Sequence, residues 1–151
     1  DGPEAPEALA AEVTRRGAGA IGVLVTDAAI PADGRGGRAP PRRPSFLLRA
    51  RPGSIESAGL SPAEGRLACV VFDRLILRPL TRQDAEAAVR SACLSYHQDP
   101  AEAAAGHGAV FLLPPVRLDD LWDVAREGKR LPAKSTYFAP KIPSGLMLRP
   151  I

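Results

Sequence analysis

The stretch "AIGVLVT", residues 20–26, decides the fold that we expect for this chain. Its run of β-branched and aliphatic residues is typical of a buried strand. The run "SFLLRAR" (45–51) predicts a second strand that could pair with the first in antiparallel fashion, and "ACLSY" (92–96) and "AVFLLP" (109–114) predict two more. Because helical segments alternate with these strands, the sequence predicts an α+β fold, or an α/β fold, with helices packed on a mixed sheet.

The helices are predicted from apolar spacing and from capping residues. Leu9 and Val13 lie four residues apart, which predicts a helix over 6–16. Ser61 and Glu64 form the pattern of a capping box at the start of a helix that we expect Pro79 to end. Shorter helices are expected over "DAEAAVR" (84–90) and after Asp99. A last helix is expected over 117–127, with its apolar stripe on Leu118, Leu121, Trp122 and Ala125.

Composition limits the classes of protein. A chain of 151 residues is long enough for a single domain with its own core. No run approaches the ~20 apolar residues of a membrane helix, and the acidic start "DGPEAPEALA" is not a signal peptide. We therefore expect a soluble, cytoplasmic protein, in which Cys69 and Cys93 are buried, reduced thiols. The chain begins with Asp1 and its only methionine is Met147, so we expect it to be a piece of a longer protein.

The segment 27–44 is dense in Pro, Gly and Arg, and we expect it to be a flexible loop. Nucleic-acid binding is one function that this loop suggests. However, the net charge is only +3, aromatic residues make up 5% and there is no asparagine, so the composition gives little support for nucleic acid as a partner. The basic residues of the loop are Arg35, Arg38, Arg42 and Arg43.

Three motifs could carry chemistry, but each has a simpler explanation. "GAGAIG" (17–22) matches a dinucleotide fingerprint, yet the expected order of helix and strand around it is the reverse of the one that a phosphate site needs. Two cysteines and two histidines are too few and too widely spaced for a zinc site, so we predict no metal. The acidic cluster at the start of the last helix suits the helix dipole, although a metal or acid/base role stays open. Its members are Asp119, Asp120 and Asp123.

The segment "KSTYFAPK" (134–141) is the strongest candidate for a binding site. The chain has only three lysines, Lys129, Lys134 and Lys141, and two of them flank this segment. Together with the hydroxyl groups of Ser135 and Thr136, they could bind a phosphate or carboxylate. The alternative is that the aromatic residues of the segment pack in the core while its lysines are solvated.

The end of the chain resembles a known family. The string "VFLLPPVRLDDLWDVAREGKRLPAKSTYFAPKIPSGLMLRPI" (110–151) is similar to the C-terminal end of the bacterial and archaeal family called domain of unknown function 1015. "LACVVFDRLILRPL" and "CLSYHQDPAEAA" resemble preceding blocks of that family more loosely. The best-matched positions are Gly128, Pro132, Lys134, Ser135, Thr136, Tyr137, Phe138, Pro140, Lys141, Ser144, Gly145 and Leu146. Ala133 and Ala139 depart from the family pattern.

The resemblance implies a part in a larger enzyme. Family members are longer, so this chain would correspond to roughly the last third. Their N-terminal part is reminiscent of the ParB and sulfiredoxin-type fold, which includes a serine kinase. That implies ATP or ADP as a cofactor, a small phosphorylated or amino-acid ligand, and the N-terminal part of the same protein as a partner. The alternatives are a structural domain without chemistry and a ParB-like nucleic-acid-binding protein.

Overall fold

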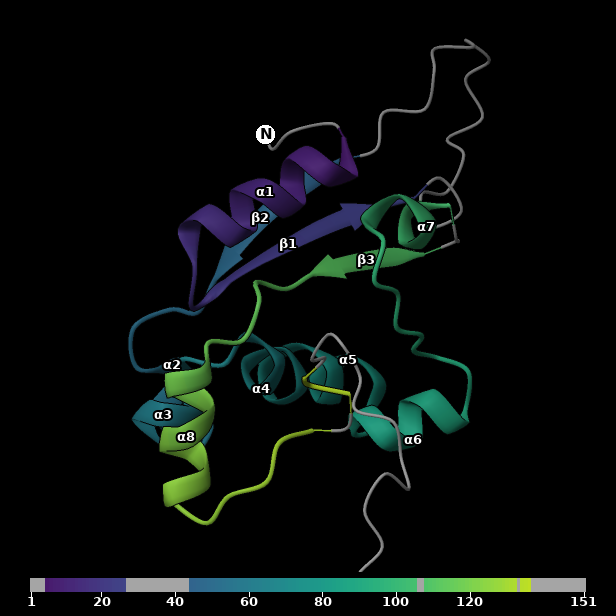
Figure 1. Ribbon diagram of the computed structural model, residues 1–151. Helices are drawn as coiled ribbons and strands as arrows, with labels where there is room; N and C mark the ends of the chain where they lie inside the picture. The colour runs from purple at the N-terminus through teal and green to yellow at the C-terminus, as the bar shows by residue number, and fades with distance from the viewer. Residues whose placement is uncertain (1–4, 27–43, 106–107, 133, 137–151) are drawn as a thin grey trace, which may run out of the picture.

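The computed structural model describes residues 5–26, 44–105, 108–132 and 134–136. In Figure 1 a small sheet with two helices occupies one half of the molecule, and the remaining helices occupy the other. The elements in chain order are α1 (Pro6–Arg16), β1 (Ala20–Val25), β2 (Ser45–Arg49), α2 (Ser54–Ser57), α3 (Pro62–Gly65), α4 (Ala68–Phe72), the π-helical turn η2 (Asp73–Leu77), α5 (Arg78–Thr81), α6 (Ala85–Arg90), α7 (Pro100–Ala104), β3 (Ala109–Leu112) and α8 (Leu118–Arg126).

The sheet has three strands in the order β2-β1-β3, and both pairings are antiparallel. Ala20 lies opposite Arg49 on one side, and Gly22 lies opposite Leu112 on the other. The prediction of an α+β fold is therefore confirmed. The described strands form an antiparallel sheet rather than a mixed one, which removes the α/β alternative. The central strand β1 is almost entirely buried, as its apolar sequence predicts.

Helices cover one face of the sheet because a glycine lets them approach closely. Leu9 and Val13 of α1 are fully buried against Leu24 and Leu112, and Ala104 of α7 completes this cluster. A Cβ atom at position 22 would lie 2.8 Å from Cγ2 of Val13, closer than two carbon atoms can pack. The glycine at this position thus fixes the distance between α1 and the sheet.

The opposite face packs on the helical half. Ile21 joins a cluster with Val71 and Phe72 of α4, and the ring of Phe72 lies 4.8 Å from that of Phe111 on β3. A third cluster, which includes Leu67 and Val124, joins α3, α4 and α8. These contacts hold the sheet and the helices together and leave a space between them.

The sequence predicted that Pro79 would end the helix that follows Ser61, and this prediction is wrong. The helical stretch 68–81 continues past Pro79. The turn Asp73–Leu77 widens into a π-helix, in which the N–H of Arg78 donates to the carbonyl of Asp73. Proline lacks an N–H and clashes with the carbonyl four residues earlier in an α-helix. The wider turn accommodates that clash, so the helix continues to Thr81.

The predicted strand 92–96 is absent, and this part of the prediction is wrong. Ala92 has φ of 57°, and the amides of Cys93 and Leu94 both donate to the carbonyl of Ala88 at the end of α6. These bonds end a helix instead of starting a strand. Cys93 is consequently exposed rather than buried, Cys69 is half-buried, and both are free cysteines.

The last helix, α8, forms where expected but buries a different side. Val124 is buried and Leu121 half-buried, whereas Leu118 and Trp122 remain 57% and 56% exposed. The predicted apolar stripe is therefore wrong. The face of α8 that meets α3 buries Val124 in the third cluster and carries Asp120 and Asp123, which pair with Arg66. Within the described ranges, no helix is long and apolar enough to cross a membrane.

Candidate functional site

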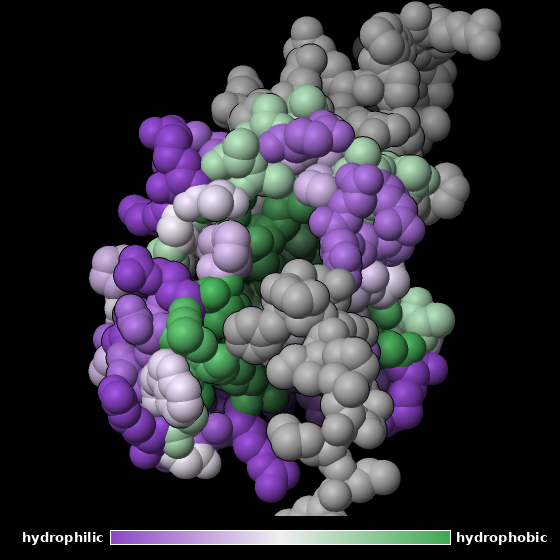
Figure 2. Space-filling view, viewed as in Figure 1, coloured by the Kyte–Doolittle hydropathy of each residue, from purple (hydrophilic) through white to green (hydrophobic). Residues whose placement is uncertain are grey.

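A cleft of about 740 Å³ lies between the sheet and the helices. Its walls come from α4, the segment 92–100, β3, the link after β3, and three residues near the end of the described chain, Pro132, Lys134 and Ser135. Figure 2 shows a hollow between the two halves of the molecule with hydrophobic residues deep inside it. Because five separate parts of the chain meet here, the cleft is the best candidate for a ligand site among the described residues.

Two residues of the predicted anion-binding segment line this cleft, Lys134 and Ser135. The amide and the hydroxyl of Ser135 both donate to the carbonyl of Pro132, at 3.3 and 2.5 Å, which closes a tight turn. Lys134 occupies this turn with φ of 59° and is exposed. It forms no ion pair with any described residue. Thr136 is exposed beside it.

Two thiols line the cleft, those of Cys69 and Cys93, and Cys69 is not an activated nucleophile. Cys69 is half-buried and lines the cleft together with Ser135. Burial raises the pKa of the Cys69 thiol above its ordinary value, and the hydroxyl of Ser135 only partly opposes this effect. Burial also raises the pKa of Tyr96, and the Asp73 carboxylate acts in the same direction. Both groups therefore stay protonated at neutral pH and offer hydrogen bonds, not negative charge.

The buried carboxylate of the cleft, Asp73, is engaged in holding the fold. Its side chain is 3% exposed. One oxygen accepts from Nε of Arg78 at 2.8 Å, and the other accepts from the amide of Ala85 at 3.1 Å. That amide is one of the unpaired donors at the start of α6, where Asp84 caps another. Asp73 thus joins the π-turn to α6, a role that sequence reasoning missed because the partners lie 12 residues apart.

The histidine of the cleft bonds to its neighbours. Nε2 of His97 lies 3.1 Å from the hydroxyl of Ser95, and Nδ1 lies 3.6 Å from the carboxylate of Glu102. His107 lies outside the described residues. In the part of the chain that the structure describes, no three His, Cys, Asp or Glu side chains are placed to bind a metal ion together.

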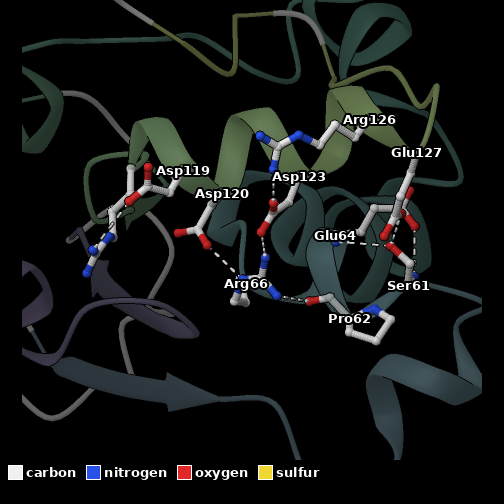
Figure 3. A network of polar contacts seen from close by, with 10 residues as sticks. Ser61, Pro62, Glu64, Arg66, Asp119, Asp120, Asp123, Arg126 and Glu127 are labelled. Carbon is white, nitrogen blue, oxygen red and sulfur yellow. Dashed lines mark hydrogen bonds and ion pairs between the residues drawn. The ribbon is translucent and has the colours of Figure 1, made fainter.

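The acidic cluster of α8 forms an ion-pair network with α3, drawn in Figure 3. Arg66 donates to Asp120 at 2.7 Å through Nε and to Asp123 at 2.5 Å through Nη2. Asp119 points away and lies 3.9 Å from Arg117. Two of the three predicted aspartates therefore bind a guanidinium group of the chain itself, which accounts for their presence without a metal ion.

One lysine belongs to the same contact between α3 and α8. Lys129 pairs with Glu64 at 2.5 Å and with Glu127 at 3.6 Å. The side chain of Glu64 also accepts a hydrogen bond from the amide of Ser61, and the side chain of Ser61 accepts one from the amide of Glu64. The predicted capping box is therefore confirmed. The bond from Lys129, followed by that from Ser61, lowers the pKa of Glu64. The position of Lys129 is thus explained by structure rather than by a ligand.

Several predicted functional residues lie outside the described residues. They are Tyr137, Phe138, Pro140, Lys141, Ser144 and Gly145 of the tail, and Arg35, Arg38, Arg42 and Arg43 of the segment 27–44. The "GAGAIG" motif is described, and it follows α1 and precedes β1, the reverse of a dinucleotide site. Searches against family models, curated proteins and solved structures found no match to this chain.

Proposed function

We propose that this chain is the C-terminal, ligand-binding domain of a longer cytoplasmic protein of the phosphotransferase kind, and that its cleft holds the phosphate of a small ligand. The resemblance to domain of unknown function 1015 suggests the reaction class and ATP or ADP as the nucleotide. The cleft supports a binding role in that reaction. The catalytic groups would come from the N-terminal part of the same protein.

One observation carries the proposal: Lys134 stands on the wall of the cleft in a left-handed conformation. For a residue with a Cβ atom this conformation costs about 1 kcal/mol, and glycine would adopt it freely. Arg82 and Ala92 adopt the same conformation, so the backbone alone does not single out Lys134. Lys134 differs from them because it places an exposed ammonium group, without an ion-pair partner among the described residues, on the wall of the cleft. A compact ammonium with three donors suits a phosphate oxygen.

The remaining groups of the cleft favour binding over catalysis. The carboxylate of Asp73 is engaged by Arg78 and Ala85. The raised pKa of Cys69 keeps its thiol protonated. Phosphoryl transfer depends mainly on positioning and on charge, so a domain that supplies one cation and an apolar wall can assist it without a catalytic base.

The proposal is tested by titrating the chain with ADP and with inorganic phosphate, and following amide resonances by NMR. We expect saturable shifts at Lys134, Ser135 and Thr136 in the wild type. Lys134→Gly should weaken binding by about tenfold, because it removes one charge-assisted contact. The matched control is Arg82→Gly, which removes a positive charge from another left-handed position, φ 57°, that does not line the cleft. If Lys134→Gly and Arg82→Gly bound ADP and phosphate with equal affinity, the role of Lys134 would be refuted. A structural domain would then be the better explanation.

A further inference from the structure

A second, smaller cleft of about 360 Å³ lies where the end of α1 meets the link between β3 and α8. Three arginines line it: Arg15 from α1, Arg117 from the start of α8, and Arg66 from the end of α3. Pro114 and Pro115 form part of the wall. Two adjacent prolines fix the backbone of this link, so the wall is rigid. The first cleft, by contrast, carries one lysine and no arginine among its lining residues.

Two of the three arginines have donors to spare. Arg15 binds Glu12 through Nε and Nη2, which leaves the two N–H groups of Nη1. Arg117 lies 3.9 Å from Asp119, too far for a hydrogen bond. Both side chains are highly exposed, at 73% and 76%. They therefore stand at the mouth of the cleft, available to a ligand that enters it.

The turn that follows α1 adds a backbone donor. Ala18 lines the cleft within this turn, between two glycines that have φ of 68° and 82°. Among the backbone hydrogen bonds of the described turns, the amide of Ala18 donates none. Backbone amides and guanidinium groups are both common donors to carboxylate oxygens.

The charge of the cleft decides how strongly an anion could bind. Three arginines and one aspartate line it, and the aspartate, Asp120, is already paired with Arg66. The carboxylates just outside, those of Glu12, Asp119 and Asp123, are paired with these arginines and with Arg16 and Arg126, so positive charge around the cleft exceeds negative charge by only one. The C-terminal end of α1 is also slightly negative. An anion is therefore bound by direct donors at the mouth and not by a long-range field, which predicts weak binding that falls as salt increases.

We propose that this second cleft binds a small dicarboxylate, with one carboxylate on Arg15 and the amide of Ala18 and the other on Arg117. A guanidinium group matches the planar, two-oxygen geometry of a carboxylate. Two exposed arginines from different elements match a ligand with two such groups. This site is separate from the first cleft and does not depend on its function.

The test is a titration of the 151-residue chain with succinate, read from the amide resonances of Gly17, Ala18 and Arg117. Acetate at the same ionic strength is the control for charge alone. The test variant is Arg15→Gln with Arg117→Gln. The matched control is Arg90→Gln, which removes an arginine paired with Glu86 on α6, outside both clefts.

We expect succinate to give saturable shifts at these three amides and acetate to give none. The double variant should bind at least about tenfold more weakly, Arg90→Gln should bind like the wild type, and Lys134→Gly should not change succinate binding. Arg15→Lys with Arg117→Lys should give an intermediate affinity, because lysine keeps the charge and loses the planar fork. Identical shifts with succinate and acetate, or undiminished binding by the double variant, would overturn the proposal.

Discussion

Replacing Asp73 tests whether the buried carboxylate of the large cleft serves the fold. Asp73→Ala removes the acceptor of the Ala85 amide in a buried place, and it removes the partner of Arg78. A buried donor left without a partner costs about 1–3 kcal/mol. The ion pair adds at most about 1 kcal/mol, since Arg78 is 43% exposed and water screens it.

Together these terms predict a loss of about 1–4 kcal/mol in the free energy of unfolding. For a chain of this size that corresponds to a decrease in Tm on the order of 10 °C. Asp73→Asn should cost less, because its amide oxygen can still accept from Ala85 while its NH2 group cannot accept from Arg78. Urea unfolding gives the free energies, and hydrogen exchange at the Ala85 amide gives the local effect.

The comparison of the two variants separates a structural role from a catalytic one. If Asp73 has a structural role, the wild type should be the most stable, Asp73→Asn less stable and Asp73→Ala the least stable. The Ala85 amide should also exchange faster in both variants than in the wild type. It also requires that Asp73→Asn bind ADP as the wild type does. A loss below about 0.5 kcal/mol in Asp73→Ala would show that the bonds in the cleft contribute little to folding, and the carboxylate would then have to be explained by a ligand.

Three further measurements test other parts of the structure. Gly22→Ala should destabilise the protein by about 1–3 kcal/mol in urea unfolding, because the new methyl group would overlap α1; a neutral substitution would contradict the close packing. The pKa of Glu64 is lowered, chiefly by Lys129, so its contribution to stability should be present above its ordinary value of 4.5 and be lost as the pH falls through the lower folded value. Unfolding measured from pH 7 to pH 3 should show this loss in the wild type, and Glu64→Gln should reduce it. Cys93 should react with iodoacetamide before Cys69 at pH 7, since burial raises the pKa of Cys69 and shields it. Mass spectrometry of the labelled peptides gives the order of reaction, and earlier labelling of Cys69 would contradict this prediction.

The parts of the fold that depend on local signals could be predicted from the sequence. The capping box of Ser61 and Glu64 and the caps at Asp84 and Asp99 all involve bonds that span two or three residues. The apolar runs of β1 and β3 are equally local. Such features do not depend on what the rest of the chain does, and they formed where expected.

The errors arose where a distant partner decides the structure. The run 92–96 has residues suited to a strand, but in the described part of the chain no neighbouring strand pairs with it, and Ala92 turns the backbone at the end of α6 instead. The buried side of α8 depends on distant partners, because Val124 packs in a cluster with Leu67 and Asp120 pairs with Arg66, 54 residues earlier. No spacing rule within α8 contains that information. The cleft is equally non-local, so from the sequence we could name Lys134 and Ser135 but not their neighbours Cys69, Asp73 and Tyr96.

The concentration of lysine in a chain otherwise rich in arginine has two separate explanations. Lys129 lies between two carboxylates, those of Glu64 and Glu127, at the contact of α3 and α8, where one compact ammonium serves both. Lys134 follows five residues later and has no such partner among the described residues, although it occupies a backbone conformation that favours glycine. Stability therefore explains the first lysine and leaves the second unexplained. Lys134 is exposed on the wall of a large cleft, and this contrast between the two lysines is the main reason to look for an anion beside Lys134.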